Sequence, residues 1–295
     1  MISDKQVESY RENGYLMVED VIDRDTLTQI KRVIADLVEG ARGKTTHDDV
    51  YDLEPTHTPD NPRVRRIKKP NLVHPVFDQV VKSERMVSIL KRLLGENIRL
   101  HGSKLNMKAP HYGSPVEWHQ DWAFYPHSND DILAIGCVLD DMLLENGPLM
   151  VMPGTHLVDK VWDHHAEGRF CGAMDPATCG LDFSKAVSVT GPAGSCSFHH
   201  VRLVHGSAQN TSERSRNLLL YECAAADAWP FLNFTNLQEF DSRMITGSPT
   251  IEPRFKQMPV RMPYPPALNQ GSIYENQTAS RARYFDAKNE TVPAK

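Results

Sequence analysis

Three side chains in this sequence could together hold one metal ion. His119 and Asp121 lie two residues apart, and in an extended strand residues at this spacing point to the same face. His205 would have to come from another strand. Two histidines and one carboxylate on one face of an ion leave the opposite coordination positions open, which is the arrangement of non-heme Fe(II) oxygenases. The H-x-D spacing alone is weak, because a surface histidine beside a solvated aspartate has the same pattern.

The chain after His205 could provide a site for a carboxylate. Residues 210–213, Asn-Thr-Ser-Glu, have the composition of a turn between two apolar runs. A hairpin centred on this turn would place Ser207 opposite Arg216, with Ser207 on the same strand face as His205. A guanidinium beside a hydroxyl suits the far end of a dicarboxylate, through a charge-assisted bidentate pair. Arg214 has the same strand parity as Arg216 and is the alternative, although it lies nearer the turn.

The composition is that of an ordinary globular protein and argues against some classes of function. The 295 residues are 40% hydrophobic and 24% charged, so the chain can bury a sizeable core. The net charge of −5 gives no drive toward nucleic acid or an anionic membrane. No apolar run approaches the ~20 residues of a transmembrane helix. Five cysteines without a CxxC pair, after a polar amino-terminal segment, predict reduced thiols in a cytoplasmic protein.

The first third of the sequence predicts helices and one strand. Helices are expected over residues 4–13, 23–37 and 83–94, from their capping residues and their apolar residues at helical spacing. A short apolar strand is expected at 15–18. Residues 41–62 are polar and predict a long excursion of the kind that is usually functional or mobile.

The pattern then changes to short β-rich runs that are separated by turn residues. The expected strands cover residues 98–108, 131–139, 149–152, 186–189, 195–199, 203–207 and 218–223. Many short strands of this kind predict a sandwich or a barrel. After Trp229 the chain is proline-rich and irregular, which indicates a covering tail. We therefore expect one domain over residues 1–295, with a helical part at 1–96, a β core at 97–225 and a covering tail at 226–295.

Several segments of the chain resemble the phytanoyl-CoA dioxygenase family of Fe(II)/2-oxoglutarate oxygenases. The resemblance covers most of residues 3–225, and the segments follow the family's order. They are Tyr10-Arg-Glu-Asn-Gly14-Tyr, Leu105-Asn-Met-Lys108, Trp118-His-Gln-Asp121, Glu145-Asn-Gly-Pro-Leu149, Met152-Pro-Gly-Thr-His156, Val204-His-Gly-Ser207, Arg214 and Arg216. Each segment alone is common, but together and in this order they are specific.

The resemblance implies a mainly β fold with helical support, namely a double-stranded β-helix (jelly roll, cupin-like). It implies Fe(II) held by His119, Asp121 and His205, with 2-oxoglutarate and O2 as cosubstrates. It also implies binding of 2-oxoglutarate by further residues, which are Arg216, Ser207, Asn106, Lys104 and Arg66. The implied reaction is hydroxylation, or another oxidation, of an aliphatic C–H in a small-molecule metabolite, with release of succinate and CO2.

The substrate side of the site is expected from residues near the ligands and in the tail. These residues are Lys108, Trp122, Phe124, Tyr125, Cys137 and Trp229. Many family members have a tryptophan eighteen residues after the first ligand, where this chain has Cys137, so the pocket is expected to be larger. Trp122, Phe124 and Tyr125 are equally consistent with core packing.

Other interpretations of the same residues remain open. His164, His165, His199 and His200 are interpreted as core or loop histidines with satisfied hydrogen bonds rather than as ligands. The basic run 63–69 could hold an anionic substrate, whereas nucleic acid is disfavoured because the run lacks interleaved aromatic residues. Related halogenases have Gly or Ala at the position of Asp121, so hydroxylation is favoured here. The alternative functions are an acyl-CoA hydroxylase of the same mechanism and a non-catalytic metal-binding module of cupin type.

Overall fold

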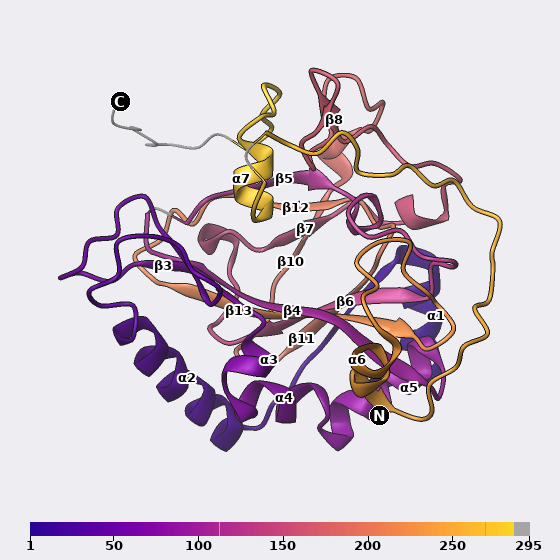
Figure 1. Cartoon of the computed structure of the whole chain (residues 1–295), viewed down its shortest axis with the longest axis horizontal. Helices are drawn as coiled ribbons and strands as arrows, with labels where there is room; N and C mark the ends of the chain where they lie inside the picture. Colours follow the sequence, from indigo (N-terminus) through magenta and orange to yellow (C-terminus); the bar gives the residue numbers. More distant parts are fainter. Residues whose placement is uncertain (112, 269, 286–295) are drawn as a thin grey trace.

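Two antiparallel sheets face each other and form the β core (Figure 1). They belong to a computed structural model that describes residues 1–111, 113–268 and 270–285. The larger sheet contains, in spatial order, β1 (Tyr15–Val18), β11 (Cys196–His200), β6 (Ile132–Val138), β13 (Arg216–Ala225), β4 (Ile98–Lys108), β3 (Val64–Lys68) and β2 (Tyr51–Leu53), with β14 (Met244–Thr246) also paired to β4. The smaller sheet contains β10 (Val187–Val189), β7 (Leu149–Val151), β12 (His205–Ser207) and β5 (Val116–His119).

Every strand pair within the described residues is antiparallel. A separate hairpin of β8 (His165–Ala166) and β9 (Arg169–Phe170) lies outside the two sheets. Two facing antiparallel sheets that exchange strands make a jelly roll. The predicted double-stranded β-helix is therefore confirmed.

Helices from the first hundred residues cover the outer face of the larger sheet (Figure 1). They are α1 (Asp4–Asn13), α2 (Arg24–Glu39), α3 (Pro70–Val73), α4 (Pro75–Val81) and α5 (Glu84–Leu94). Ser3 and Gln6 form a capping box at the start of α1, and Gly14 ends this helix in the left-handed conformation. Within the described ranges, no helix is long and apolar enough to cross a membrane.

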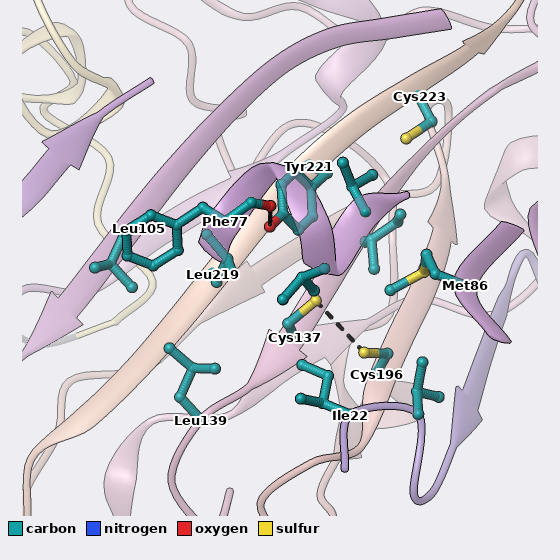
Figure 2. Close-up of a cluster of buried hydrophobic side chains, with 14 of the residues drawn as sticks. Ile22, Phe77, Met86, Leu105, Cys137, Leu139, Cys196, Leu219, Tyr221 and Cys223 are labelled. Atoms are coloured by element: carbon teal, nitrogen blue, oxygen red, sulfur yellow. Dashed lines mark hydrogen bonds between the residues drawn. The ribbon is translucent and has the colours of Figure 1, made fainter. Parts of the chain in front are cut away.

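The main core lies between these helices and the larger sheet. Leu105, Cys137 and Leu219 point from their strands toward Phe77 of α4 and Met86 of α5, and all five are buried (Figure 2). The three strand residues have odd numbers. Because side chains alternate along a strand, the even-numbered residues of the same strands face the space between the two sheets. The site described below occupies that space.

The predicted hairpin between residues 207 and 216 is wrong. β12 pairs with β5 and β7 in the smaller sheet, whereas β13 pairs with β4 and β6 in the larger sheet. The turn itself forms, since Asn210 Nδ2 donates to the carbonyl oxygens of Lys108 and Arg214 at 3.1 and 2.6 Å. It carries the chain from one sheet to the other, and a crossover uses the same local turn residues as a hairpin.

The strand that carries the first candidate ligand is shorter than expected. β5 ends at His119, and Asp121 begins the 3₁₀ helix η1 (Asp121–Ala123). Gln120 between them keeps extended backbone angles, with φ −115° and ψ 131°. The two side chains therefore still point the same way, although the sheet ladder has ended.

Several elements were not predicted from the sequence. β2 lies inside the expected excursion, and β3, α3 and α4 follow it. β2 and β3 extend the larger sheet, so part of the expected helical region belongs to the β core, and the division at residues 96 and 225 stays a prediction. The tail contains α6 (Leu237–Ser242), β14 and α7 (Ile273–Gln277), and residues 286–295 of the expected tail lie outside the described residues.

Substitution of Gly14 should destabilise the fold at the junction of α1 and β1. Gly14 has φ +81°, and a Cβ there would lie 2.5 Å from His156 Nδ1 and 2.8 Å from Leu203 Cδ1. A left-handed alanine costs roughly 1–2 kcal/mol before any clash. We expect Gly14→Ala to lower the free energy of unfolding by more than this, as measured by urea denaturation. Gly43→Ala is the control, because Gly43 has φ +79° with nothing within 4 Å of the added Cβ. Equal losses in the two variants would show that the clash is absent.

Candidate active site

Three buried side chains converge in the space between the two sheets. His119, the last residue of β5, is the direct strand partner of His205, the first residue of β12. Asp121 Oδ1 lies 3.8 Å from His119 Nε2 and 4.0 Å from His205 Nε2. One ligand atom from each residue lies within 4.8 Å of the others, which is close enough for a single ion. The three predicted ligands are thus brought together.

Hydrogen bonds orient both imidazole rings for metal binding. His119 Nδ1 is 2.8 Å from the carbonyl oxygen of Glu117, and His205 Nδ1 is 2.9 Å from that of Leu203. A carbonyl only accepts, so each Nδ1 carries the proton and each Nε2 offers a lone pair toward Asp121. Burial lowers the pKa of His119 to about 4 and holds the pKa of His205 well below its usual range. Both rings are therefore neutral, and two neutral imidazoles with one carboxylate fit Fe(II).

The carboxyl group of Asp121 is ionised in this environment. Burial opposes its ionisation, but the neighbouring His199 and the charge of Lys104 more than offset burial and hold its pKa well below the usual range. Its second oxygen, Oδ2, lies 3.6 Å from His199 Nε2. Oδ1 of Asp121 therefore faces His119 and His205, whereas Oδ2 faces His199. With this orientation the carboxylate can bind an ion through Oδ1 alone.

His199 differs from the other histidines that were interpreted as core residues. It lines the cavity beside the ligands, and neither ring nitrogen has a hydrogen-bond partner within the described residues. His164, by contrast, accepts from the Gln120 backbone N–H at 2.9 Å and donates to the Trp162 carbonyl. The expectation of satisfied hydrogen bonds holds for His164 but not for His199.

A small cavity of about 70 Å³ next to the ligands contains two buried cations. Lys108 Nζ donates to Ser207 Oγ at 2.9 Å and to the carbonyl oxygen of Ala208. Arg216 Nη2 donates to the Gly147 carbonyl at 2.7 Å, and its Nε has no hydrogen-bond partner within the described residues. Lys108 and Arg216 are direct partners across β4 and β13.

These two cations lack a counter-ion among the described residues. Their hydrogen bonds there go to neutral oxygens, those of Ser207, Ala208 and Gly147. Burial lowers the pKa of Arg216 to about 10, and burial together with the Arg216 charge lowers the pKa of Lys108 well below its usual value. Two like charges opposite each other in a buried site are unfavourable unless an anion joins them. The cavity is therefore suited to a carboxylate group.

The predicted cosubstrate residues are distributed over two cavities. Asn106 and Lys104 line the first cavity together with Ser207 and Arg216. Arg214, the alternative to Arg216, is exposed. Arg66 does not line the first cavity but lies at a second one, where it forms an ion pair with Asp52 at 2.6 Å.

The second cavity is larger, about 380 Å³, and meets the first at Asp121, Lys104 and Ile273. Four cations line it, namely Arg66, Lys68, Lys69 and Lys104, together with Phe124, Tyr125, Glu222 and residues of α7. The Tyr125 hydroxyl is buried without a hydrogen-bond partner among the described residues. Burial, and then the charge of Asp121, raises the pKa of Tyr125 well above its usual value, so the hydroxyl keeps its proton.

Four residues expected on the substrate side lie elsewhere. Cys137 has an odd number on β6 and points into the helix-facing core, 3.4 Å from Cys196 Sγ (Figure 2), so it does not enlarge the pocket. Trp122 is buried and donates its indole N–H to the Pro259 carbonyl. Trp229 packs on Phe240. Lys108 lines the first cavity and is not among the residues that line the second.

Residues of α7 were missed entirely by the sequence analysis. Ile273 and Tyr274 line the first cavity beside Arg216. Ser272 and Glu275 form a capping box, which is a readable signal for the start of this helix. No sequence pattern indicates where such a short helix docks.

Comparisons with known proteins show the family of the chain. The family model of phytanoyl-CoA dioxygenase (PhyH) matches residues 10–218. The chain is 38% identical over 285 residues to the probable alpha-ketoglutarate-dependent hypophosphite dioxygenase of Stutzerimonas stutzeri, covering 95% of this chain and 99% of that protein. It is 28% identical to the ectoine dioxygenase of Bordetella bronchiseptica, covering 72% of this chain and 71% of that protein. The crystal structure of EctD from S. alaskensis with 2-oxoglutarate and 5-hydroxyectoine has a TM-score of 0.66 at 22% identity, covering 88% of each chain, and supports the fold.

Iron binding should require all three candidate ligands. We expect His119→Ala, Asp121→Ala and His205→Ala each to abolish both turnover and the visible absorbance that forms when Fe(II) and 2-oxoglutarate bind together. His165→Ala is the control, because His165 bonds Asp163 and the Tyr264 carbonyl away from the cavity. Full activity in any of the three ligand variants would contradict the assignment.

Arg216 should govern binding of 2-oxoglutarate more than binding of iron. A hydrogen bond to a charged group contributes roughly 1.5–3 kcal/mol, and ~1.4 kcal/mol corresponds to tenfold in affinity. We therefore expect Arg216→Ala to raise the Kd of 2-oxoglutarate at least about tenfold in an anaerobic titration, with little change in the Kd of Fe(II). The exposed Arg214 provides the matched control, and a larger effect of Arg214→Ala would reverse the choice between the two arginines.

Proposed function

The chain belongs to the phytanoyl-CoA dioxygenase family, and from this premise we propose that its substrate is a small anion, with hypophosphite as the first candidate. The protein is an Fe(II)- and 2-oxoglutarate-dependent dioxygenase. When bound, the iron activates O2 for oxidation of the substrate while 2-oxoglutarate is converted to succinate and CO2. The protein's residues orient these groups and keep water out.

In this proposal the two cavities have separate roles. His119, Asp121 and His205 hold the iron, and the neutral imidazoles with one ionised carboxylate support this assignment. Arg216 and Lys108 bind the distal carboxylate of 2-oxoglutarate, with Ser207 held against Lys108. Lys104 and Asn106 line the path between that carboxylate and the iron. The second cavity, which Asp121 also lines, receives the substrate.

The charge of the second cavity supports an anionic substrate. Asp52 alone pairs with both Arg66 and Lys68, at 2.6 and 2.9 Å. Glu222 pairs with Lys104 at 3.0 Å. The cations of this wall therefore outnumber its carboxylates, apart from Asp121, which is assigned to the iron. A small oxyanion bound in this cavity would neutralise the excess positive charge of its wall.

The relative from Stutzerimonas stutzeri supports hypophosphite in particular. That protein is described as a probable hypophosphite dioxygenase and resembles this chain over nearly its whole length. Oxidation of hypophosphite converts one P–H bond into P–OH and yields phosphite, with one atom of O2 going to phosphorus and the other to succinate. The outcome is still hydroxylation, as Asp121 predicts, but of P–H rather than C–H. Support for a non-catalytic module is weaker, because all three ligands are present, and the names of the relatives given above do not specify an acyl-CoA substrate.

We also propose that the protein works in the cytoplasm. All five cysteines are free, and Cys137 and Cys196 remain thiols although their sulfur atoms are only 3.4 Å apart. Free thiols suit a reducing compartment.

The test is a substrate panel of hypophosphite, ectoine and L-proline with Fe(II), 2-oxoglutarate and O2. We expect hypophosphite to give phosphite, seen by phosphorus NMR, in equal amount to succinate, with one atom from ¹⁸O2 in the phosphite. Asp121→Ala is the control for uncatalysed oxidation. Succinate formation coupled to ectoine or L-proline but not to hypophosphite would overturn the anion proposal and leave the reaction class intact.

A further inference from the structure

The short helix α7 of the tail closes the cavity that holds the two buried cations. It lies beyond residues 10–218, to which the family model is matched, and it sits beside β5 at the edge of the smaller sheet (Figure 1). Ile273 lines both cavities, and Tyr274 lines the first together with Arg216. The tail therefore forms part of the cavity wall.

Strong contacts hold α7 in this position. The buried Gln277 accepts from the Glu117 backbone N–H at 2.9 Å and donates to the Gly172 carbonyl at 2.9 Å. Glu117 is the residue whose carbonyl oxygen orients His119. Glu275 forms an ion pair with Arg65, and the Arg65 guanidinium lies 4.9 Å from the centre of the Tyr274 ring. The ring of Tyr274 is thus fixed from one side by a cation.

The hydroxyl of Tyr274 has no protein partner. The residue is 7% exposed, and no hydrogen bond of its hydroxyl occurs within the described part of the chain. Burial raises its pKa, while the charges of Arg216 and Arg65 act against burial, with smaller effects from Glu54 and Arg66. The phenol is therefore protonated near neutral pH and can donate one hydrogen bond into the cavity.

We propose that Tyr274 binds 2-oxoglutarate, its hydroxyl donating to the distal carboxylate beside Arg216, so that α7 completes the cosubstrate pocket. This inference rests on the proposed role of Arg216. An anion between Arg216 and Lys108 leaves carboxylate lone pairs that the two cations do not use, because a carboxylate has about four acceptor positions. Of the two described tail residues that line this cavity, Ile273 and Tyr274, Tyr274 is the one whose side chain carries a donor.

The experiment compares two ligands that differ only in the distal carboxylate. The Kd of 2-oxoglutarate and of 2-oxopentanoate, which lacks that group, are measured anaerobically on the Fe(II) protein by absorbance titration. We expect Tyr274→Phe to raise the Kd of 2-oxoglutarate about tenfold. The Kd of 2-oxopentanoate, the Kd of Fe(II) and the Tm should be unchanged, because the ring keeps its place under Arg65. Tyr264→Phe, at a 57% exposed tyrosine of the same tail, is the matched control.

The possible outcomes distinguish a wrong role for Tyr274 from a wrong assignment of the cosubstrate site. If Tyr274→Phe weakens both ligands equally, or neither, Tyr274 does not contact the distal carboxylate. If Arg216→Ala selectively weakens 2-oxoglutarate while Tyr274→Phe does not, only the role of Tyr274 is wrong. If Arg216→Ala leaves the Kd of 2-oxoglutarate unchanged, the proposed cosubstrate site is wrong and the inference about Tyr274 is wrong with it.

Discussion

The pairing of β5 with β12 is the constraint on which the active site depends. It sets His119 directly opposite His205, and Nδ1 of each ring bonds the carbonyl oxygen two residues earlier in the chain. The strand pairing fixes the position of the imidazoles, and these neighbouring carbonyls fix their tautomer. A slip of one residue in this register would turn one histidine out of the interior, because strand side chains alternate. Asp121 then needs only one extended residue, Gln120, to reach the same space.

The fold also buries two positive charges that no carboxylate compensates within the described residues. Lys108 and Arg216 face each other across two strands of the larger sheet, both buried and both without a carboxylate partner in the described residues. A protein selected for stability alone would not keep such a pair. An anion that binds between them relieves the repulsion in the folded state only, so binding and folding stability are coupled. The lowered pKa of Lys108 has the same origin, since burial and the Arg216 charge both disfavour its cationic form.

The sequence was sufficient to predict that His119, Asp121 and His205 come together, because their chemistry and their spacing both point to one arrangement. It was also sufficient for the fold class, since short strands with turn residues and an ordered set of family motifs agree. Prediction from the sequence failed where the same local pattern of residues is compatible with two different strand connections. Asn210 builds a turn whether the chain makes a hairpin or crosses between sheets, so Ser207 and Arg216 were predicted as ladder partners. Lys108 was expected with the substrate residues, whereas the structure places it in the first cavity together with Lys104 and Asn106.

The residues that line the second cavity come from parts of the chain before, between and after the candidate iron ligands. Arg66 and Lys68 lie on β3, Phe124 and Tyr125 follow the ligand pair, and Ile273 belongs to the tail. Strands of the larger sheet and segments outside it therefore line the second cavity together. The chain resembles proteins whose names specify hypophosphite and ectoine, and a shared fold does not by itself determine the substrate. In this chain Arg66, Lys68 and Lys104 line a cavity that Asp121 also lines, and this positive charge beside Asp121 is the feature on which the proposal of an anionic substrate rests.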